Sequence, residues 1–256
     1  VSKELLNEQI YWEVSAARKN WLKKVVEARW AVPSWPEEWH GRAIANEQAS
    51  IIEREFAKVR APGAGQDRNN LWANTLLAQG QQGLKEKLIG PLLRSEVNMC
   101  LLYSEPGAGS DLAGIRTRAD KQGDHYLVNG QKVWTSGAHY CDYGILLVRT
   151  NPEKEKHKGL TMFIVNMKQA GVEVRPIHQA SGGREFNEVY FTDARIPDSQ
   201  RLGAVGVSDH DDRQFGRGRA DRRQQGRHGD REWFTWFTVF GLSGGTGMGQ
   251  AENGEA

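Results

Sequence analysis

Residues 101–111 read Leu-Leu-Tyr-Ser-Glu-Pro-Gly-Ala-Gly-Ser-Asp, and this stretch is the most informative part of the chain. Glycine accepts backbone conformations with positive φ and lets a ligand approach the main chain, while proline favours a turn. The hydroxyl groups of Ser104 and Ser110 can each donate and accept a hydrogen bond. The composition suits a loop that holds a polar ligand. A plain β-turn capped by Asp111 is the alternative, which Gly-Ala-Gly-Ser taken alone would favour.

A second informative stretch, Trp134-Thr135-Ser136, follows one expected hairpin later. An aromatic face with two hydroxyl groups beside it suits a planar heterocyclic ligand. The alternative is a core tryptophan at the end of a strand, because aromatic residues are common in sheets. We expect the ligand-facing arrangement.

The motif Tyr-Ser-Glu-Pro-Gly-Ala-Gly-Ser-Asp at 103–111 resembles the signature of the acyl-CoA dehydrogenase family. Residues 123–139, Gly-Asp-His-Tyr-Leu-Val-Asn-Gly-Gln-Lys-Val-Trp-Thr-Ser-Gly-Ala-His, resemble the next block of that family. The resemblance runs from about Trp30 to about Gly203, with its blocks in the family's order and spacing. It implies an α+β multi-domain fold, in which an N-terminal helical domain precedes an antiparallel β-barrel or sandwich domain.

The resemblance also implies FAD as the cofactor. The residues that it assigns to cofactor binding are Leu101, Leu102, Tyr103, Ser104, Gly109, Ser110, Trp134, Thr135 and Ser136. By the same resemblance, the Trp134 side chain lies against the flavin and the neighbouring hydroxyl groups lie near its ring edge. Ser110 is in addition a contact of the acyl-CoA substrate.

The activity implied by the resemblance is α,β-dehydrogenation of acyl-CoA thioesters in fatty acid β-oxidation, with hydride transfer to FAD. An electron-transfer flavoprotein is then the expected electron acceptor. In the family, the catalytic base is a glutamate of a C-terminal helical domain, which is not recognisable in this sequence. The resemblance gives Glu105 a structural role, so no catalytic residue is named and we expect weak or no activity from the chain alone.

Two alternatives remain open. The first is a non-catalytic subunit that binds flavin or acyl-CoA and assembles with a longer paralogue. The second is an acyl-CoA oxidase or a related flavin monooxygenase.

The composition narrows the class of protein. The chain has 256 residues, a formal net charge of +2, 26% charged residues and 38% hydrophobic residues, which is ordinary for a globular protein. This near balance of charge gives no case for nucleic acid, and no apolar run approaches the length that spans a bilayer. The two cysteines, Cys100 and Cys141, have no metal-ligand or disulfide spacing, so we expect no metal site. We expect a cytoplasmic protein. Both homo- and hetero-oligomers are left open as assembly states.

The hydrophobic periodicity predicts helices first and strands later. Helices are expected at 4–30, 47–60, 71–79 and 84–94, the last of them broken or kinked at Gly90-Pro91. Asn129-Gly130 predicts the two-residue turn of a hairpin between 125–128 and 131–134, because both turn positions need positive φ. Further short strands are expected at 144–150, 160–166, 172–177 and 188–192.

These patterns predict a helical domain at 1–99 and a β domain at 100–205. The resemblance implies that the β domain binds flavin and acyl-CoA. Residues 206–256 differ, since 208–231 is rich in Arg, Asp, Gln and Gly and lacks a sustained structural period. We interpret 206–256 as an aberrant tail that is disordered or results from a frameshift. A genuine divergent tail is the alternative.

Overall fold

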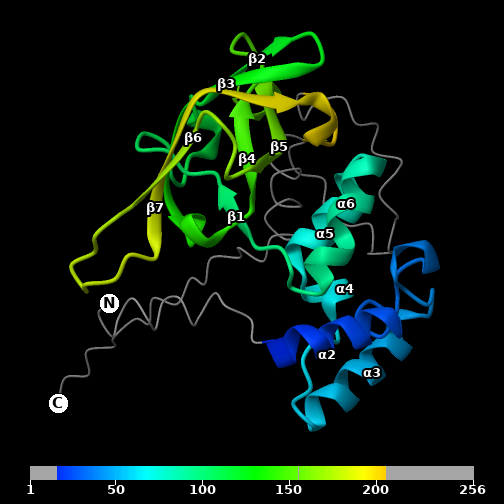
Figure 1. The fold of residues 1–256 in the computed structure, drawn as a ribbon. Coiled ribbons are helices and arrows are strands. Elements are labelled where there is room, and N and C mark those ends of the chain that lie inside the picture. The colour runs from blue at the N-terminus through cyan, green and yellow to red at the C-terminus, as the bar shows by residue number, and fades with distance from the viewer. Residues whose placement is uncertain (1–15, 155, 206–256) are drawn as a thin grey trace, which may run out of the picture. The chain divides into compact units, whose positions relative to one another are not determined.

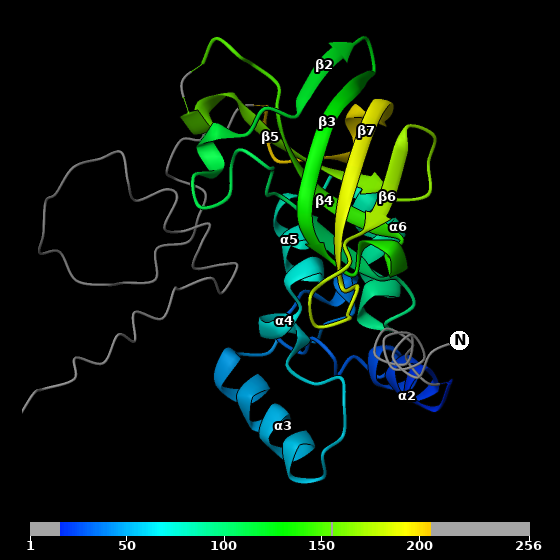
Figure 2. The same cartoon turned by 90° about the vertical axis from the view of Figure 1, so that its left-hand side faces the viewer.

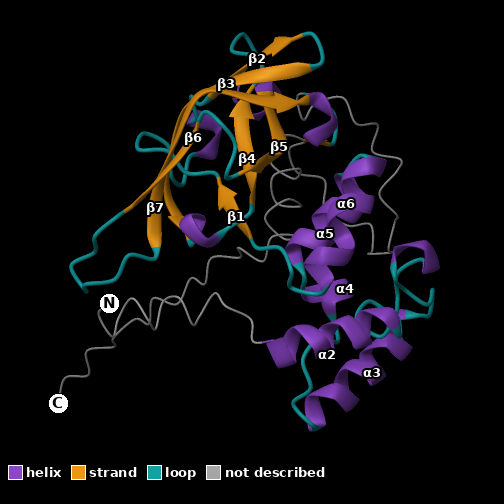
Figure 3. Cartoon of the chain, in the orientation of Figure 1, coloured by secondary structure: helices purple, strands orange, loops and turns teal. Residues whose placement is uncertain are grey.

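The computed structural model describes residues 16–154 and 156–205, which all belong to one compact unit. Its helices come first and its strands follow (Figure 3). The helices are α2 (Ala16–Glu27), α3 (Asn46–Lys58), α4 (Gln66–Asn69), α5 (Leu71–Gln79) and α6 (Gln82–Leu93), and short 3-10 turns lie at Glu37–Trp39, Leu112–Gly114, Ala138–Tyr140, Lys156–Gly159 and Asp198–Gln200. Residues 4–15 of the first expected helix, and the whole expected tail, lie outside the described residues.

Helix α6 differs from its prediction, because it continues through Pro91 to Leu93 without a break. Proline costs the helix one backbone hydrogen bond. The apolar side chains of Ile89, Leu92 and Leu93 are buried on either side of it. Their burial outweighs the local preference of the Gly90-Pro91 pair.

The strands form one mixed, mainly antiparallel sheet in the order β6-β7-β3-β2-β4-β5-β8, with β1 paired to β4 outside this path (Figure 1). Their bounds are β1 (Met99–Leu102), β2 (Arg118–Gln122), β3 (His125–Ser136), β4 (Tyr143–Arg149), β5 (Leu160–Asn166), β6 (Val172–Pro176), β7 (Phe186–Pro197) and β8 (Arg201–Leu202). Both β1 and the start of β2 run parallel to β4. The long strands β3 and β7 lie side by side (Figure 2).

The expected hairpin at Asn129-Gly130 is wrong. Strand β3 runs without interruption from His125 to Ser136, and the hairpin that exists joins β2 to β3 just before it. Gly130 has a φ of +149° and lies in β3 beside a register shift, where the single residue Asn129 faces Thr192 and Asp193 of β7. The extra residue is therefore a bulge in β7, and no turn forms at Asn129-Gly130. The Asn129 side chain exchanges two hydrogen bonds of 2.9 Å with Asp193 of β7, which stabilise the bulged strand.

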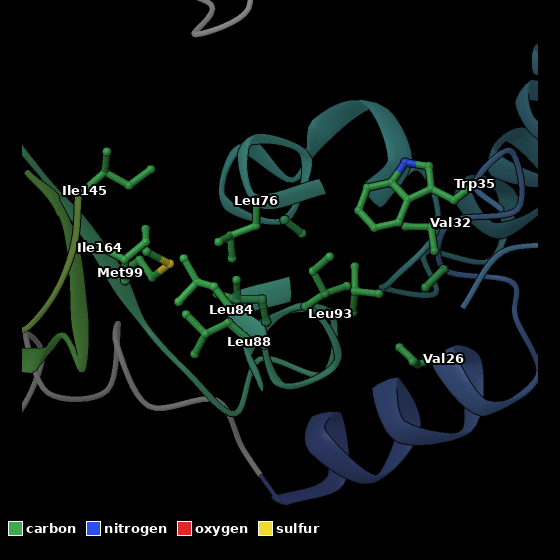
Figure 4. Close-up of a cluster of buried hydrophobic side chains, with 14 of the residues drawn as sticks. Val26, Val32, Trp35, Leu76, Leu84, Leu88, Leu93, Met99, Ile145 and Ile164 are labelled. Carbon is green, nitrogen blue, oxygen red and sulfur yellow. The ribbon is translucent and has the colours of Figure 1, made fainter. Parts of the chain in front are cut away.

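Strand β4 is buried on both faces and separates two apolar clusters. On one face, Ile145 joins Met99 and Ile164 in packing against helical residues that include Leu84 and Leu88 (Figure 4). On the other face, alternate residues of β4 pack among the sheet's own side chains; this second cluster contains Leu146, Val148, Phe163, Val128 and Ile196. The helices and the sheet therefore share a core.

The expected fold class, a helical N-terminal region followed by a mainly antiparallel β domain, is confirmed. The proposed domain boundary between residues 99 and 100 falls inside β1, after its first residue, Met99. That boundary stays a prediction.

Candidate functional site

The loop after β1 makes a tight turn at Pro106-Gly107. The Glu105 and Ala108 backbones exchange hydrogen bonds of 2.9 and 3.0 Å across it. Neither Gly107 nor Gly109 has positive φ, so the expected need for left-handed backbone does not apply to them. A Cβ atom added at either glycine would meet no atom within 4 Å, which leaves this main chain open to a ligand.

The second stretch lies at the end of β3, where a register shift between Lys132 and Thr135 changes the alternation of side chains. Trp134 adopts a φ of +60°, which is uncommon for a bulky residue. Its side chain is 59% exposed, and its ring meets Phe186 edge-on at a centroid distance of 6.1 Å. The distorted strand therefore presents an aromatic surface to the outside.

A backbone hydrogen bond joins the two stretches. The amide of Val133 donates to the carbonyl of Ser104 over 2.9 Å. Residues far apart in the sequence thus lie side by side, and Ser104 comes next to the segment that carries Trp134.

The predicted site residues differ in their burial. Leu102 and Thr135 are buried, while Leu101, Tyr103 and Ser104 are half-buried. The exposed ones are Gly109, Ser110, Trp134 and Ser136. Leu102 packs in the sheet core, so only its main chain is available to a ligand. Burial raises the pKa of the Tyr103 phenol above its usual value.

Beneath the loop lies a buried ion pair between Lys132 and Glu105, whose side chains are 0% and 7% exposed. The Lys132 ammonium donates to Glu105 Oε1 at 2.8 Å and to the carbonyl of Tyr103 at 3.0 Å. The backbone amides of Arg116 and Thr117 donate to the same carboxylate. The loop is thereby tied to β3 and to the segment that leads into β2.

Burial and the partner's charge shift the pKa of each member of this pair in opposite directions. Burial lowers the pKa of Lys132 to about 8, although the Glu105 carboxylate works to raise it. Burial alone raises the pKa of Glu105, but the Lys132 charge and the hydrogen bonds from Lys132, Thr117 and Arg116 bring it below its usual value. Glu105 is consequently a carboxylate at neutral pH.

Thr135 carries a buried hydroxyl whose hydrogen-bonding capacity is unused among the described residues. Its side chain is 2% exposed, and Oγ1 has no hydrogen-bond partner among the described residues. The carbonyl of Thr135 is held at 2.9 Å by the buried side-chain amide of Asn187. Asn187 Oδ1 also lies 2.8 Å from His139 Nδ1. These contacts fix the end of β3 but give the hydroxyl of Thr135 no hydrogen-bond partner.

The arrangement suits a planar ring with polar edge atoms. Trp134 offers an exposed aromatic face, and the unpaired hydroxyl of Thr135 is its neighbour in the chain. Within residues 16–154 and 156–205, no three potential His, Cys, Asp or Glu ligands gather to bind a metal ion. None of the helices in those ranges is both long and apolar enough to cross a membrane.

Sequence reasoning did not assign Lys132 or Asn187 to the site. The period of two along β3 puts Lys132 on the same face as the buried Tyr126 and Val128, which is a signal that could have found it. Asn187 offers no comparable signal, because its partners come from positions far away in the sequence.

Comparison with known proteins gives matches over the part of the chain that contains both candidate stretches. Residues 100–194 match the acyl-CoA dehydrogenase middle domain. The chain is 38% identical over 196 residues to the acyl-CoA dehydrogenase IpdE1 of Mycobacterium tuberculosis, covering 76% of this chain and 51% of IpdE1. It is 39% identical over 178 residues to FadE34, an acyl-CoA dehydrogenase of the same organism, covering 68% of this chain and 24% of FadE34.

A similar structure is the crystal structure of the ChsE4-ChsE5 complex from Mycobacterium tuberculosis. It aligns with a TM-score of 0.59 and 34% identity, over 74% of this chain and 49% of the solved chain. The chain thus spans about half the length of IpdE1 and of that solved chain, and about a quarter of FadE34. Within that shared part, its sequence and fold agree with theirs, and the chain belongs to the acyl-CoA dehydrogenase family.

Proposed function

We propose that this chain provides the flavin-binding face of an acyl-CoA dehydrogenase site. The reaction is the α,β-dehydrogenation of an acyl-CoA thioester, in which FAD, when bound, accepts the β-hydrogen as hydride. The observation that carries the proposal is the Val133–Ser104 hydrogen bond, which brings the two candidate stretches together beside an exposed tryptophan.

The residues present fit a flavin. The exposed face of Trp134 offers apolar area to a planar ring. The buried hydroxyl of Thr135 has no other partner among the described residues, and a polar ring atom would satisfy it. The open main chain at Gly107 and Gly109 allows the rest of the cofactor to approach closely, with Ser104 beside it.

For the substrate, we propose Ser110 as a contact, since it is exposed beyond the turn and can hydrogen-bond an acyl-CoA.

No residue of this chain is proposed as the base that removes the α-proton. Such a base must come within hydrogen-bond reach of that proton. We therefore propose weak or no dehydrogenase activity for the chain alone, and an electron-transfer flavoprotein as acceptor when the site is complete. A cytoplasmic location stays a prediction from the sequence.

A second candidate is a subunit that binds flavin or acyl-CoA and works with a longer partner of the same family. The observation that favours it is the similar ChsE4-ChsE5 structure, which is a complex of two different chains. In this candidate the partner chain supplies the catalytic base.

Flavin binding tests the proposal. The purified 256-residue chain is titrated with FAD, and the quenching of flavin fluorescence is followed. Trp134→Ala is expected to weaken FAD binding about fivefold, because stacking on an aromatic face contributes about 1 kcal/mol. Ile51→Ala is the matched control, since Ile51 is a large exposed apolar residue on α3. No FAD binding by the wild-type chain would contradict the proposal.

Activity separates the candidates. Acyl-CoA-dependent reduction of a dye by the chain alone would overturn the proposed inactivity, and oxygen consumption would indicate an oxidase. Activity that appears only after a longer paralogue is added would support the subunit candidate.

A further inference from the structure

Lys132 lies where three separate segments of the chain meet. Its ammonium donates to the carbonyl of Tyr103 at 3.0 Å and to the carboxylate of Glu105 at 2.8 Å. The Lys132 side chain is completely buried. Its charged end is therefore directed at the loop and not at solvent.

Glu105 is itself fixed from another direction. Its two carboxylate oxygens accept the backbone amides of Thr117 at 2.9 Å and of Arg116 at 2.6 Å. Hydrogen bonds to a charged partner in a buried place are stronger than neutral ones. The carboxylate thus holds the ammonium at one point, and the ammonium holds the Tyr103 carbonyl.

Two consecutive carbonyl groups are held by two consecutive residues of β3. Lys132 binds the carbonyl of Tyr103, and the amide of Val133 binds the carbonyl of Ser104. The direction of the peptide between Tyr103 and Ser104 is thereby set. The next residue along β3 is Trp134, so the same two bonds relate the Ser104 hydroxyl to the exposed ring.

We propose that Lys132 is a positioning residue of the flavin face, and that through the Tyr103 carbonyl it sets where Ser104 lies relative to Trp134. This inference rests on the proposed function. Stability alone does not explain a lysine here, since an apolar pair of similar volume often stabilises a protein as well as a buried ion pair. An apolar side chain cannot donate a hydrogen bond to Tyr103.

The first test is FAD titration of the full chain and three variants. Lys132→Met removes the donor to Tyr103, and we expect FAD affinity to fall by about tenfold. Glu105→Gln leaves an amine that still donates to Tyr103, and we expect a loss below about threefold. Ile196→Val removes one buried methyl group from β7 and controls for reduced stability, so FAD affinity is expected to stay unchanged.

The second test is amide hydrogen exchange without flavin. In Lys132→Met, the amides of Val133 and Glu105 are expected to exchange at least tenfold faster, because the peptides that they hold lose their anchor. In Ile196→Val, the exchange rates of these two amides are expected to rise by no more than the factor that the loss of global stability accounts for.

The two tests fail in different ways. If the wild-type chain does not bind FAD, the proposed function is wrong, and exchange still decides the role of Lys132. Unchanged exchange at Val133 and Glu105 in Lys132→Met would overturn the positioning role, even if FAD affinity fell. Faster exchange with full FAD affinity would overturn it as well, since the ordered loop would then be irrelevant to the flavin.

Discussion

The buried ammonium of Lys132 gives the chain a particular dependence of stability on pH. Burial lowers its pKa to about 8 in the folded chain, whereas an unfolded lysine keeps its proton to about pH 10.4. Between these values the unfolded state binds more protons, so the free energy of unfolding rises with pH. We expect Lys132 to contribute a rise of about 2 kcal/mol between pH 8 and pH 10.

Urea unfolding of the wild-type chain and Lys132→Met at several pH values measures this rise. Other groups that titrate in the same range are common to both proteins and cancel in the difference. Parallel stability curves for the two proteins would contradict the prediction.

Thr135 supplies a second prediction at this scale. Thr135→Val replaces a buried, unpartnered hydroxyl by a methyl group of similar shape. We expect the stability of the flavin-free chain to stay equal or to rise by up to about 1 kcal/mol, because no hydrogen bond is lost. FAD affinity is expected to fall about tenfold, because the hydroxyl is then missing from the ring edge. Thermal unfolding and FAD titration check the two halves, and a large loss of stability would show that the hydroxyl has a partner.

At the scale of the element, β3 depends on Gly130, which lies beside the register shift between β3 and β7. A Cβ atom there would lie 2.6 to 2.8 Å from atoms of Thr117, and its φ of +149° is strained for any other residue. We expect Gly130→Ala to cost about 2 kcal/mol or more. Gly107→Ala is the matched control, since a Cβ atom meets nothing there. Chemical unfolding measures both, and equal stability of the two variants would be the contrary result.

Helix α5 and strand β3 show which features the local sequence predicts and which it does not. Helix α5 has the predicted bounds, Leu71–Gln79, and the side chain of Asn70, directly before it, accepts the amide of Ala73. The Asn129-Gly130 pair has the composition of a turn, but Asp193 of β7 pairs with Asn129 and keeps the strand extended. That partner is too distant in the sequence for local rules.

The candidate site also contains residues that were predicted from the sequence and residues that were not. The resemblance selected the loop after β1 and the end of β3, and Val133 and Ser104 join them. It did not reveal the Lys132–Glu105 pair, because a lysine in a strand is ordinarily taken to face water. The alternation of side chains along 125–136 places Lys132 on the face of the buried Tyr126 and Val128, but only the tertiary contacts show that its partner is Glu105.

At the scale of the whole described unit, the helices and the sheet share one core, so they should lose stability together. Leu88 of α6 and Ile145 of β4 belong to the same apolar cluster. We expect Leu88→Ala to lower the free energy of unfolding by about 2–5 kcal/mol. The exchange of amides in β4 should accelerate by the matching factor.

Val59→Ala, at the exposed residue that follows α3, is the control for this variant, and it should leave amide exchange in β4 unchanged. Exchange in β4 that did not respond to Leu88→Ala would mean that the sheet holds its stability independently of the helices.

The two pairings of β4 with β1 and with β2 affect which parts of the sequence can diverge without disturbing the sheet. Leu102, the end of β1, pairs with Leu146 of β4, and Arg118, the start of β2, pairs with Arg149. These two points lie about 10 Å apart along one strand, at roughly 3.3 Å per residue. Residues 103–117 are therefore an Ω-loop whose two ends are pinned to the same strand. Insertions or exchanges within it leave the register of every strand as it was, so the ligand contacts that it carries can diverge while the sheet beneath them is inherited unaltered.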